Sequence, residues 1–159
     1  MCGMNDIRKL ILRFLVLIGC GLTVVLSMQA AESTVSILGR WLTYNDDTGE
    51  LDSMVEVYER NGEVRGKVIE IFGTEEEKNG RAKIPGEPKI VGLDIITGMK
   101  RDGAKYTGGK ILDPDNGKYY NCQLWREGSN LVMRASVLFL SSKQIWKPAI
   151  RMEGGVCPQ

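Results

Sequence analysis

Turn signals at short spacing divide most of this chain into short segments, and they limit what it can fold into. Asn61-Gly62 is the strongest signal, because Asn-Gly favours the two-residue turn of a β-hairpin. Asp115-Asn116-Gly117 marks a second hairpin, and residues 127–130 mark a third turn. The segments between these turns are rich in β-branched and aromatic residues, which predicts strands over residues 38–44, 53–60, 64–72, 106–112, 119–126, 131–140 and 143–147.

Side chains alternate in character along these predicted strands. Tyr120, Cys122 and Leu124 share one face of their strand, and Asn121 lies on the other face. Antiparallel strands joined in this way remove their exposed edges most completely by closing into a barrel. We therefore predict an all-β fold, a small antiparallel β-barrel of about eight strands, whose interior holds packed side chains or one small ligand.

One long segment interrupts the pattern. Residues 73–92 contain an acidic cluster, glycines and two prolines, and they predict a long loop. Thr74 followed by Glu77 has the spacing of a capping box, so we expect a short helical turn to begin there. Residues 93–100 are compatible with a strand or with a helical turn.

The composition argues against several kinds of site. The chain has no histidine, so it lacks the usual general base near neutral pH and the commonest zinc ligand. Its 21 Lys and Arg residues nearly balance 20 Asp and Glu residues, whereas binding to nucleic acid requires a clustered basic surface. We therefore expect a protein that is not an enzyme, holds no metal or cofactor, and binds no nucleic acid.

The first 30 residues have the order of a secretory signal peptide. Basic residues up to Arg13 precede the apolar run 14–26, and small residues follow at 27–31. We expect cleavage after Ala30 or Ala31, export to the periplasm or the medium, and a single β-barrel domain over residues 31–159. Met4 offers a second start for the same leader.

Two alternatives use the same leader residues. Leu17-Ile18-Gly19-Cys20 resembles a lipobox, which would make Cys20 the acylated first residue of an anchored lipoprotein. The apolar run that continues after Cys20 argues against this alternative. An uncleaved membrane anchor would need about 20 apolar residues. We expect lasting contact with a membrane only if the leader is uncleaved or the chain is lipidated at Cys20.

Two cysteines remain once such a leader is removed, Cys122 and Cys157. In an oxidising compartment they are able to form one disulfide, which would fasten the C-terminal tail to the strand around Cys122. A buried thiol at Cys122 and an unpaired Cys157 near the end of the chain is the other interpretation. The sequence leaves both open.

Three stretches together resemble a known bacterial family. They are GRWLT at 39–43, VEVYERNG at 55–62 and GGKILDPDNGKYY at 108–120, and Trp146 matches a tryptophan near the end of the family's domain. Over about residues 38–146 the chain resembles the domain-of-unknown-function 2147 family (DUF2147). This resemblance implies a small exported bacterial protein with a lipocalin-type β-barrel and no established activity.

The sequence also departs from that family. The loop 73–92 lacks the cysteines that many members carry, and residues 134–136 and 141–143 replace its usual Arg-Gly and Gly-Arg pairs. We therefore expect the C-terminal strands to be shaped differently from those of other members.

Most residues of the family motif have a backbone explanation, with a binding role as the alternative. Asn116 and Gly117 are expected to adopt positive φ in a tight hairpin, and Asp113 to bond its own turn. Gly108 and Gly109 are expected to permit a bulge or a bend. The motif residues with an expected structural role are Gly39, Gly108, Gly109, Asp113, Asn116 and Gly117.

Trp41, Tyr120 and Trp146 are the aromatic candidates for a ligand site or a barrel plug. Gly39-x-Trp41 also resembles the lipocalin signature, in which a tryptophan of the first strand closes one end of the barrel beneath an arginine. Arg134 or Arg151 is expected to supply that cation.

These observations favour a non-catalytic binder of a small, partly apolar ligand. The first alternative is a structural or protein-interaction module of the cell envelope that acts through its surface loops, above all 73–92. The second is a hydrolase that uses carboxylates alone, with Asp113, Asp115 or Glu70 as candidates.

Overall fold

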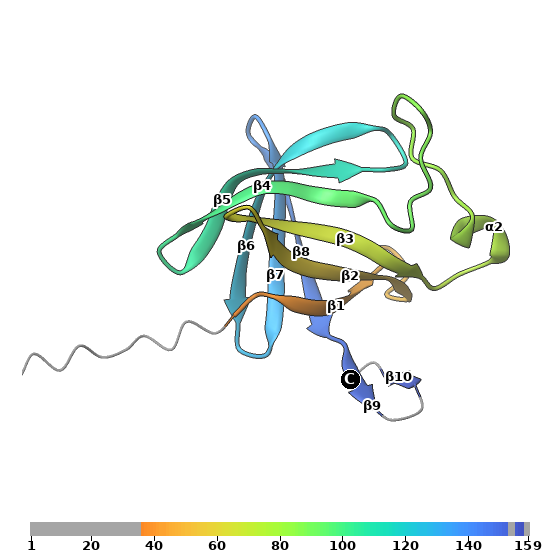
Figure 1. Cartoon of the computed structure of the whole chain (residues 1–159), viewed down its shortest axis with the longest axis horizontal. Coiled ribbons are helices and arrows are strands. Elements are labelled where there is room, and N and C mark those ends of the chain that lie inside the picture. The colour runs from red at the N-terminus through yellow and green to blue at the C-terminus, as the bar shows by residue number, and fades with distance from the viewer. Residues whose placement is uncertain (1–35, 153–154, 158–159) are drawn as a thin grey trace, which may run out of the picture. The chain divides into compact units, whose positions relative to one another are not determined.

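A computed structural model describes residues 36–152 and 155–157, and the side chains up to residue 150; the predicted leader and Cys20 lie outside this part of the chain. The described chain is almost entirely β-structure (Figure 1). Its elements are β1 (Gly39–Tyr44), β2 (Leu51–Arg60), β3 (Glu63–Ile71), α2 (Glu75–Lys78), β4 (Asp94–Asp102), β5 (Lys105–Asp113), β6 (Lys118–Glu127), β7 (Asn130–Val137), β8 (Leu140–Pro148), β9 (Ile150–Met152) and β10 (Gly155–Cys157).

Strands β1 to β8 form a closed antiparallel barrel in chain order. Each strand pairs with the next, and β8 returns to β1 through the pairs Trp41–Pro148 and Leu42–Lys147. These two pairs close the seam at the last residues of β8. The predicted all-β barrel of about eight strands is therefore confirmed, whereas the small sheet formed by β9 and β10 was not predicted.

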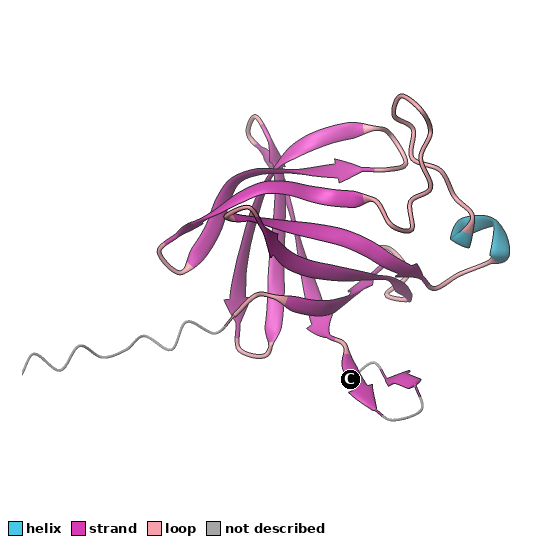
Figure 2. Ribbon diagram, in the orientation of Figure 1, coloured by secondary structure: helices cyan, strands magenta, loops and turns pink. Residues whose placement is uncertain are grey.

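The connections alternate between the two ends of this barrel, because successive strands run in opposite directions. The turns β2–β3, β4–β5 and β6–β7 lie at one end, which we call the closed end. The connections β1–β2, β3–β4, β5–β6 and β7–β8 lie at the other, which we call the mouth end. Figure 2 shows that the β3–β4 connection is much longer than the other loops of the barrel.

Two expected local features are confirmed. Asn61 and Gly62 form the β2–β3 turn with φ of 55° and 75°, the left-handed conformations for which Asn-Gly is favoured. The long loop carries the capping box: Thr74 Oγ1 accepts from Glu77 N at 3.3 Å, and Thr74 N donates to Glu77 Oε2 at 2.7 Å. The Glu77 carboxylate accepts bonds from Thr74 N and from the Thr74 hydroxyl, and these two bonds lower its pKa.

Of the segment 93–100, which the sequence left open, residues 94–100 belong to a strand, β4. The only described helix, α2, has four residues, and no helix in the described residues is long and apolar enough to cross a bilayer.

The prediction of one strand over residues 131–140 was wrong. β7 ends at Val137, Leu138 and Phe139 form a two-residue turn, and β8 begins at Leu140. This turn contains no Gly, Asn, Asp or Pro, so the sequence carried no turn signal there.

Side chains from all eight strands pack in the core of the barrel. Cys122 and Leu124 are buried in it, as the alternation along β6 predicted, and Asn121 is exposed. The largest members of this core, each no more than 2% exposed, are Ile37, Trp41, Ile96, Met99, Leu112, Leu124, Leu131 and Trp146.

Candidate functional site

A cavity of about 970 Å³ lies at the mouth end of the barrel. This volume falls within the range of about 300–1,000 Å³ that small-molecule sites occupy. Its deep wall, which we call the floor, is apolar and includes Val55, Val68, Ile111, Leu112, Met133 and Trp146. Exposed residues such as Asp52 and Ser142 also line the cavity, so it opens to solvent.

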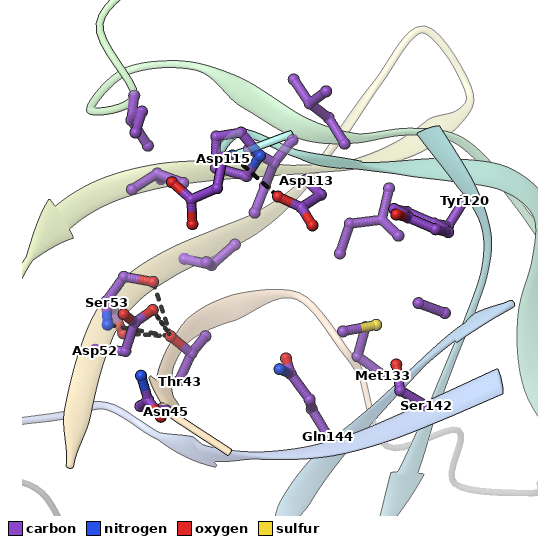
Figure 3. Close-up of a pocket in the computed structure, with 18 of the residues that line it drawn as sticks. Thr43, Asn45, Asp52, Ser53, Asp113, Asp115, Tyr120, Met133, Ser142 and Gln144 are labelled. Atoms are coloured by element: carbon purple, nitrogen blue, oxygen red, sulfur yellow. Dashed lines mark hydrogen bonds between the residues drawn. The ribbon is translucent and has the colours of Figure 1, made fainter. Parts of the chain in front are cut away.

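Polar side chains surround the opening, and we call them the rim (Figure 3). They come from β1, β2, the end of β5, the β5–β6 turn, β6 and β8, so the rim brings together residues far apart in the sequence. Its members include Thr43, Asp52, Ser53, Asp113, Asp115, Tyr120, Ser142 and Gln144.

Thr43 fixes the part of the rim that β1 and β2 contribute. Its side chain is only 5% exposed, although threonine is polar. The Thr43 hydroxyl lies 2.7 Å from Ser53 Oγ, accepts from Ser53 N at 3.1 Å, and donates to Asp52 Oδ2 at 3.2 Å. These bonds hold the Asp52 carboxylate at the rim (Figure 3).

The family motif builds the opposite part of the rim. Asp113 Oδ1 accepts from the backbone N–H of Asp115 at 2.9 Å, and Asp113 Oδ2 accepts from Asn116 Nδ2 at 2.7 Å. The same amide donates to the Tyr120 hydroxyl at 3.1 Å. The Asp113 carboxylate therefore accepts hydrogen bonds from residues of its own turn, as the sequence predicted.

One expectation for this turn was wrong. Gly117 has a positive φ of 72°, but Asn116 does not have a left-handed backbone. Asn116 stabilises the turn through its side chain instead, because its Oδ1 accepts from Lys118 N at 2.8 Å. A Cβ atom on Gly117 would collide with the carbonyl oxygen of Lys83, so the glycine also lets the long loop approach the turn. Lys83 N donates to Pro114 O at 2.9 Å across this contact.

The remaining motif glycines lie in β1 and β5. Gly108 has φ of 78°, and the β5–β6 register shifts between Tyr106 and Gly109. Gly39 has φ of 134° at the start of β1, with nothing within 4 Å of its Cβ position. These glycines shape the strands and do not line the cavity.

The cavity carries an excess of negative charge. Four acidic residues line it, Asp52, Glu77, Asp113 and Asp115, against one basic residue, Arg81. Arg81 Nη1 is engaged with the Glu87 carbonyl at 2.7 Å. Among the described residues, no Lys or Arg forms an ion pair with any of these four carboxylates. Their field therefore favours a cationic or hydrogen-donating group at the rim.

Two of the three aromatic candidates lie at the cavity. Tyr120 belongs to the rim, and Trp146, 2% exposed, belongs to the floor. Trp146 Nε1 donates to Gln144 Oε1 at 3.2 Å, and Gln144 Nε2 donates to Asp46 Oδ2 at 2.8 Å. This chain of bonds ties the floor to the β1–β2 loop.

Trp41 lies elsewhere, near the closed end, and does not line the cavity. It is 2% exposed, and its indole N–H donates to the Ile37 carbonyl at 2.9 Å. The guanidinium above its ring, 4.7 Å from the centroid, belongs to Arg126. The expectation of Arg134 was wrong, because that side chain is exposed and donates to Ser141 Oγ at 3.0 Å. The side chain of Arg151 lies outside the described residues.

Cys122 is 1% exposed in the barrel core, and burial raises the pKa of its thiol to about 12. The thiol is therefore protonated and unreactive at neutral pH. The side chain of Cys157 is not described, so the disulfide between the two cysteines stays a prediction, which thiol labelling of the native protein would test.

The carboxylates of the hydrolase hypothesis do not form a buried pair. Asp113 is bonded in its turn, Asp115 is exposed, and Glu70 is exposed and does not line the cavity. Within the described residues there is also no cluster of three or more Asp, Glu, Cys or His side chains placed to hold a metal ion.

Comparisons with known proteins agree with this architecture. The model of a family described as uncharacterized proteins conserved in bacteria, DUF2147, matches residues 39–148, the range of all eight barrel strands. Among solved structures, the barrel resembles protein HP1028 from Helicobacter pylori, described as belonging to the lipocalin family, with a TM-score of 0.61 and 20% identity over 72% of this chain and 83% of that one. No curated protein matches the sequence.

Proposed function

The chain belongs to the DUF2147 family of bacterial proteins and forms a lipocalin-like barrel, and from this premise we propose that it binds a small, partly apolar molecule without catalysis. The cavity of about 970 Å³, with its apolar floor and polar rim, supports this proposal most strongly. An apolar body in contact with Val55, Ile111 and Met133 would be removed from water, and a polar head would meet the rim.

We expect Ala135→Trp to weaken binding of a neutral apolar dye such as N-phenyl-1-naphthylamine by at least about tenfold. Ala135 lies on β7 between Met133 and Val137, which also line the cavity, so the indole would occupy the passage from rim to floor. Excluding two methylene groups of a ligand, about 0.8 kcal/mol each, is sufficient for that loss. Fluorescence titration measures it.

Arg134→Trp is the matched control, because it adds the same ring at the next residue, on the exposed outer face. It should leave dye binding within about twofold of wild type. Equal dye affinities for both variants, with both barrels folded by circular dichroism, would contradict the proposal.

The acidic rim predicts a preference for the head group. We expect protonated decylamine to displace the dye at a concentration about fivefold or more below that needed for decanoate. Each exposed charge pair contributes only about 0.2–1 kcal/mol, but attraction of the amine and repulsion of the carboxylate act in the same direction. Asp52→Asn and Asp115→Asn should reduce the preference, whereas Glu59→Gln, exposed on β2 outside the cavity, should not. Decanoate binding as tightly as decylamine would refute this ligand class.

We also propose that the protein is exported, on the strength of the basic, apolar and small segments of its first 31 residues. Intact mass spectrometry of the protein purified from the cell envelope should give a chain that begins at residue 31 or 32. An acylated Cys20 would favour the lipoprotein alternative, and a full-length chain the uncleaved anchor.

The alternative of an envelope interaction module acting through residues 73–92 stays a prediction. Glu77, Gly80, Arg81 and Ile90 of this loop line the cavity. The loop is therefore part of the candidate binding site, and deleting it should weaken dye binding whether or not it also contacts a partner.

A further inference from the structure

The β7–β8 turn presents large apolar side chains to solvent. Leu138 and Phe139, the two residues of the turn, are 91% and 90% exposed. The flanking pair, Val137 and Leu140, is 42% and 64% exposed. We call these four consecutive residues the apolar tip.

The other two-residue turns of the barrel use different residues at the same position. The first turn residue has a positive φ in each: Asn61 at 55°, Gly103 at 60° and Gly128 at 60°. The β7–β8 turn places Leu138 there, with φ of 52°. Glycine and asparagine adopt a positive φ readily, whereas the backbone of a leucine residue is strained in it.

The apolar tip therefore has two costs that an Asn-Gly turn would avoid, backbone strain at Leu138 and exposure of hydrophobic surface. Strain of this kind occurs mostly where function requires it. The barrel gains no stability in return, because Leu138 and Phe139 are not in its core. Packing within the barrel therefore does not account for the tip.

The outer face of the hairpin behind the tip is graded in polarity. The Arg134–Ser141 bond places these residues on one face, where the first pair is Ser136 with Ser141, which also border the cavity, and the next is Arg134 with Lys143. Leu138 follows Arg134 by four positions along the chain, a rise of roughly 13 Å in extended backbone. Arg134 donates to Ser141 at 3.0 Å, and in the described chain it forms no ion pair.

We propose that the apolar tip inserts into the surface of a lipid bilayer, with Arg134 at the level of the phosphates. The order apolar, hydroxyl, cation matches the order of acyl chains, esters and phosphates met on leaving a bilayer. A fluid bilayer accepts a small convex wedge of apolar side chains without a matching partner surface. Val137 and Leu140 also line the cavity, so docking holds the mouth of the barrel at the lipid surface.

The test measures bilayer contact at the tip itself, because the apolar leader of the full chain is able to bind vesicles independently. Phe139→Trp places an indole in the tip, and Ser129→Trp places one in the β6–β7 turn at the closed end. In phosphatidylcholine vesicles containing brominated acyl chains, we expect quenching of the added fluorescence for Phe139→Trp and none for Ser129→Trp. Equal quenching of the two, or none at Phe139→Trp, would overturn the proposal.

A second variant separates docking from folding. Leu138→Gly with Phe139→Ser gives the turn the residues of the β6–β7 turn, in which the first residue alone also has a positive φ, so it should unfold at the same temperature as wild type or higher. Because the leader is common to both full chains, contact is read from an indole placed beside the tip by Ser136→Trp. Brominated acyl chains should quench this indole strongly beside the wild-type tip and at least about tenfold less beside the altered turn. Equal quenching beside the two turns, or a concentration-dependent dimer that the altered turn abolishes while quenching is unchanged, would assign the tip to another role.

Discussion

Replacing Trp41 by alanine is expected to lower the free energy of unfolding by about 3–5 kcal/mol. The side chain is 2% exposed near the closed end of the barrel, where it packs in the core and its indole N–H donates to Ile37 O. Removing it leaves a cavity and an unpaired carbonyl, and it also removes the ring beneath Arg126. The total free energy of unfolding of a small domain is about 5–15 kcal/mol, so thermal or urea unfolding would show the change clearly.

Trp125→Ala is the matched control, since it deletes the same side chain from a partly exposed position outside the core. It should cost no more than about 1 kcal/mol, from contacts with Lys105 and Lys143 and one bond to Glu127. Dye binding by any Trp41→Ala protein that remains folded should be close to wild type, because Trp41 does not line the cavity. A thermal unfolding midpoint of Trp41→Ala within a couple of degrees of wild type would show that Trp41 is not a plug that closes the barrel.

Gly109→Ala is expected to destabilise the barrel by about 2–3 kcal/mol. Its Cβ would collide with the Thr97 carbonyl oxygen and Met99 Sδ, and would lie 2.8 Å from Met99 N. Two of these three atoms belong to the backbone of β4, so β4 and β5 would have to separate. Chemical unfolding of the variant measures the cost.

The neighbouring Gly108 provides the control, because its cost has a different cause. It has a positive φ of 78° and nothing within 4 Å of its Cβ position. Gly108→Asn should therefore cost less than Gly108→Ala, since asparagine tolerates this conformation. Gly109→Asn should be at least as harmful as Gly109→Ala, and recovery of stability in Gly109→Asn would contradict a steric cause.

Local signals were sufficient for most of the barrel. Asn61-Gly62 predicted a turn, and the alternation of Cys122 and Leu124 with Asn121 predicted the faces of β6, because both depend only on residues close in the sequence. The Leu138-Phe139 turn was missed for the same reason. Nothing in those residues favours a turn, and only the pairing of β7 with β8 imposes it.

The site was less predictable because it depends on contacts across the barrel. Tyr120 and Trp146 were identified as aromatic residues of a predicted core, but Thr43, Asp52 and Gln144 carry no signal in the sequence. Their proximity follows from the register of β1, β2 and β8, which the sequence does not reveal. The contact between Arg126 and the Trp41 ring was not predicted for the same reason. Arg126 lies near the end of β6, at the closed end of the barrel, so the contact becomes predictable only when the strand order is known.

The most direct test of ligand binding in the barrel is a search by NMR for contacts between decylamine and methyl-labelled protein. We expect intermolecular nuclear Overhauser effects from the alkyl chain to the methyl groups of Val55, Ile111 and Met133 on the cavity floor. Contacts confined to exposed methyl groups such as Leu138 and Ile145, with none on the floor at saturating decylamine, would contradict it.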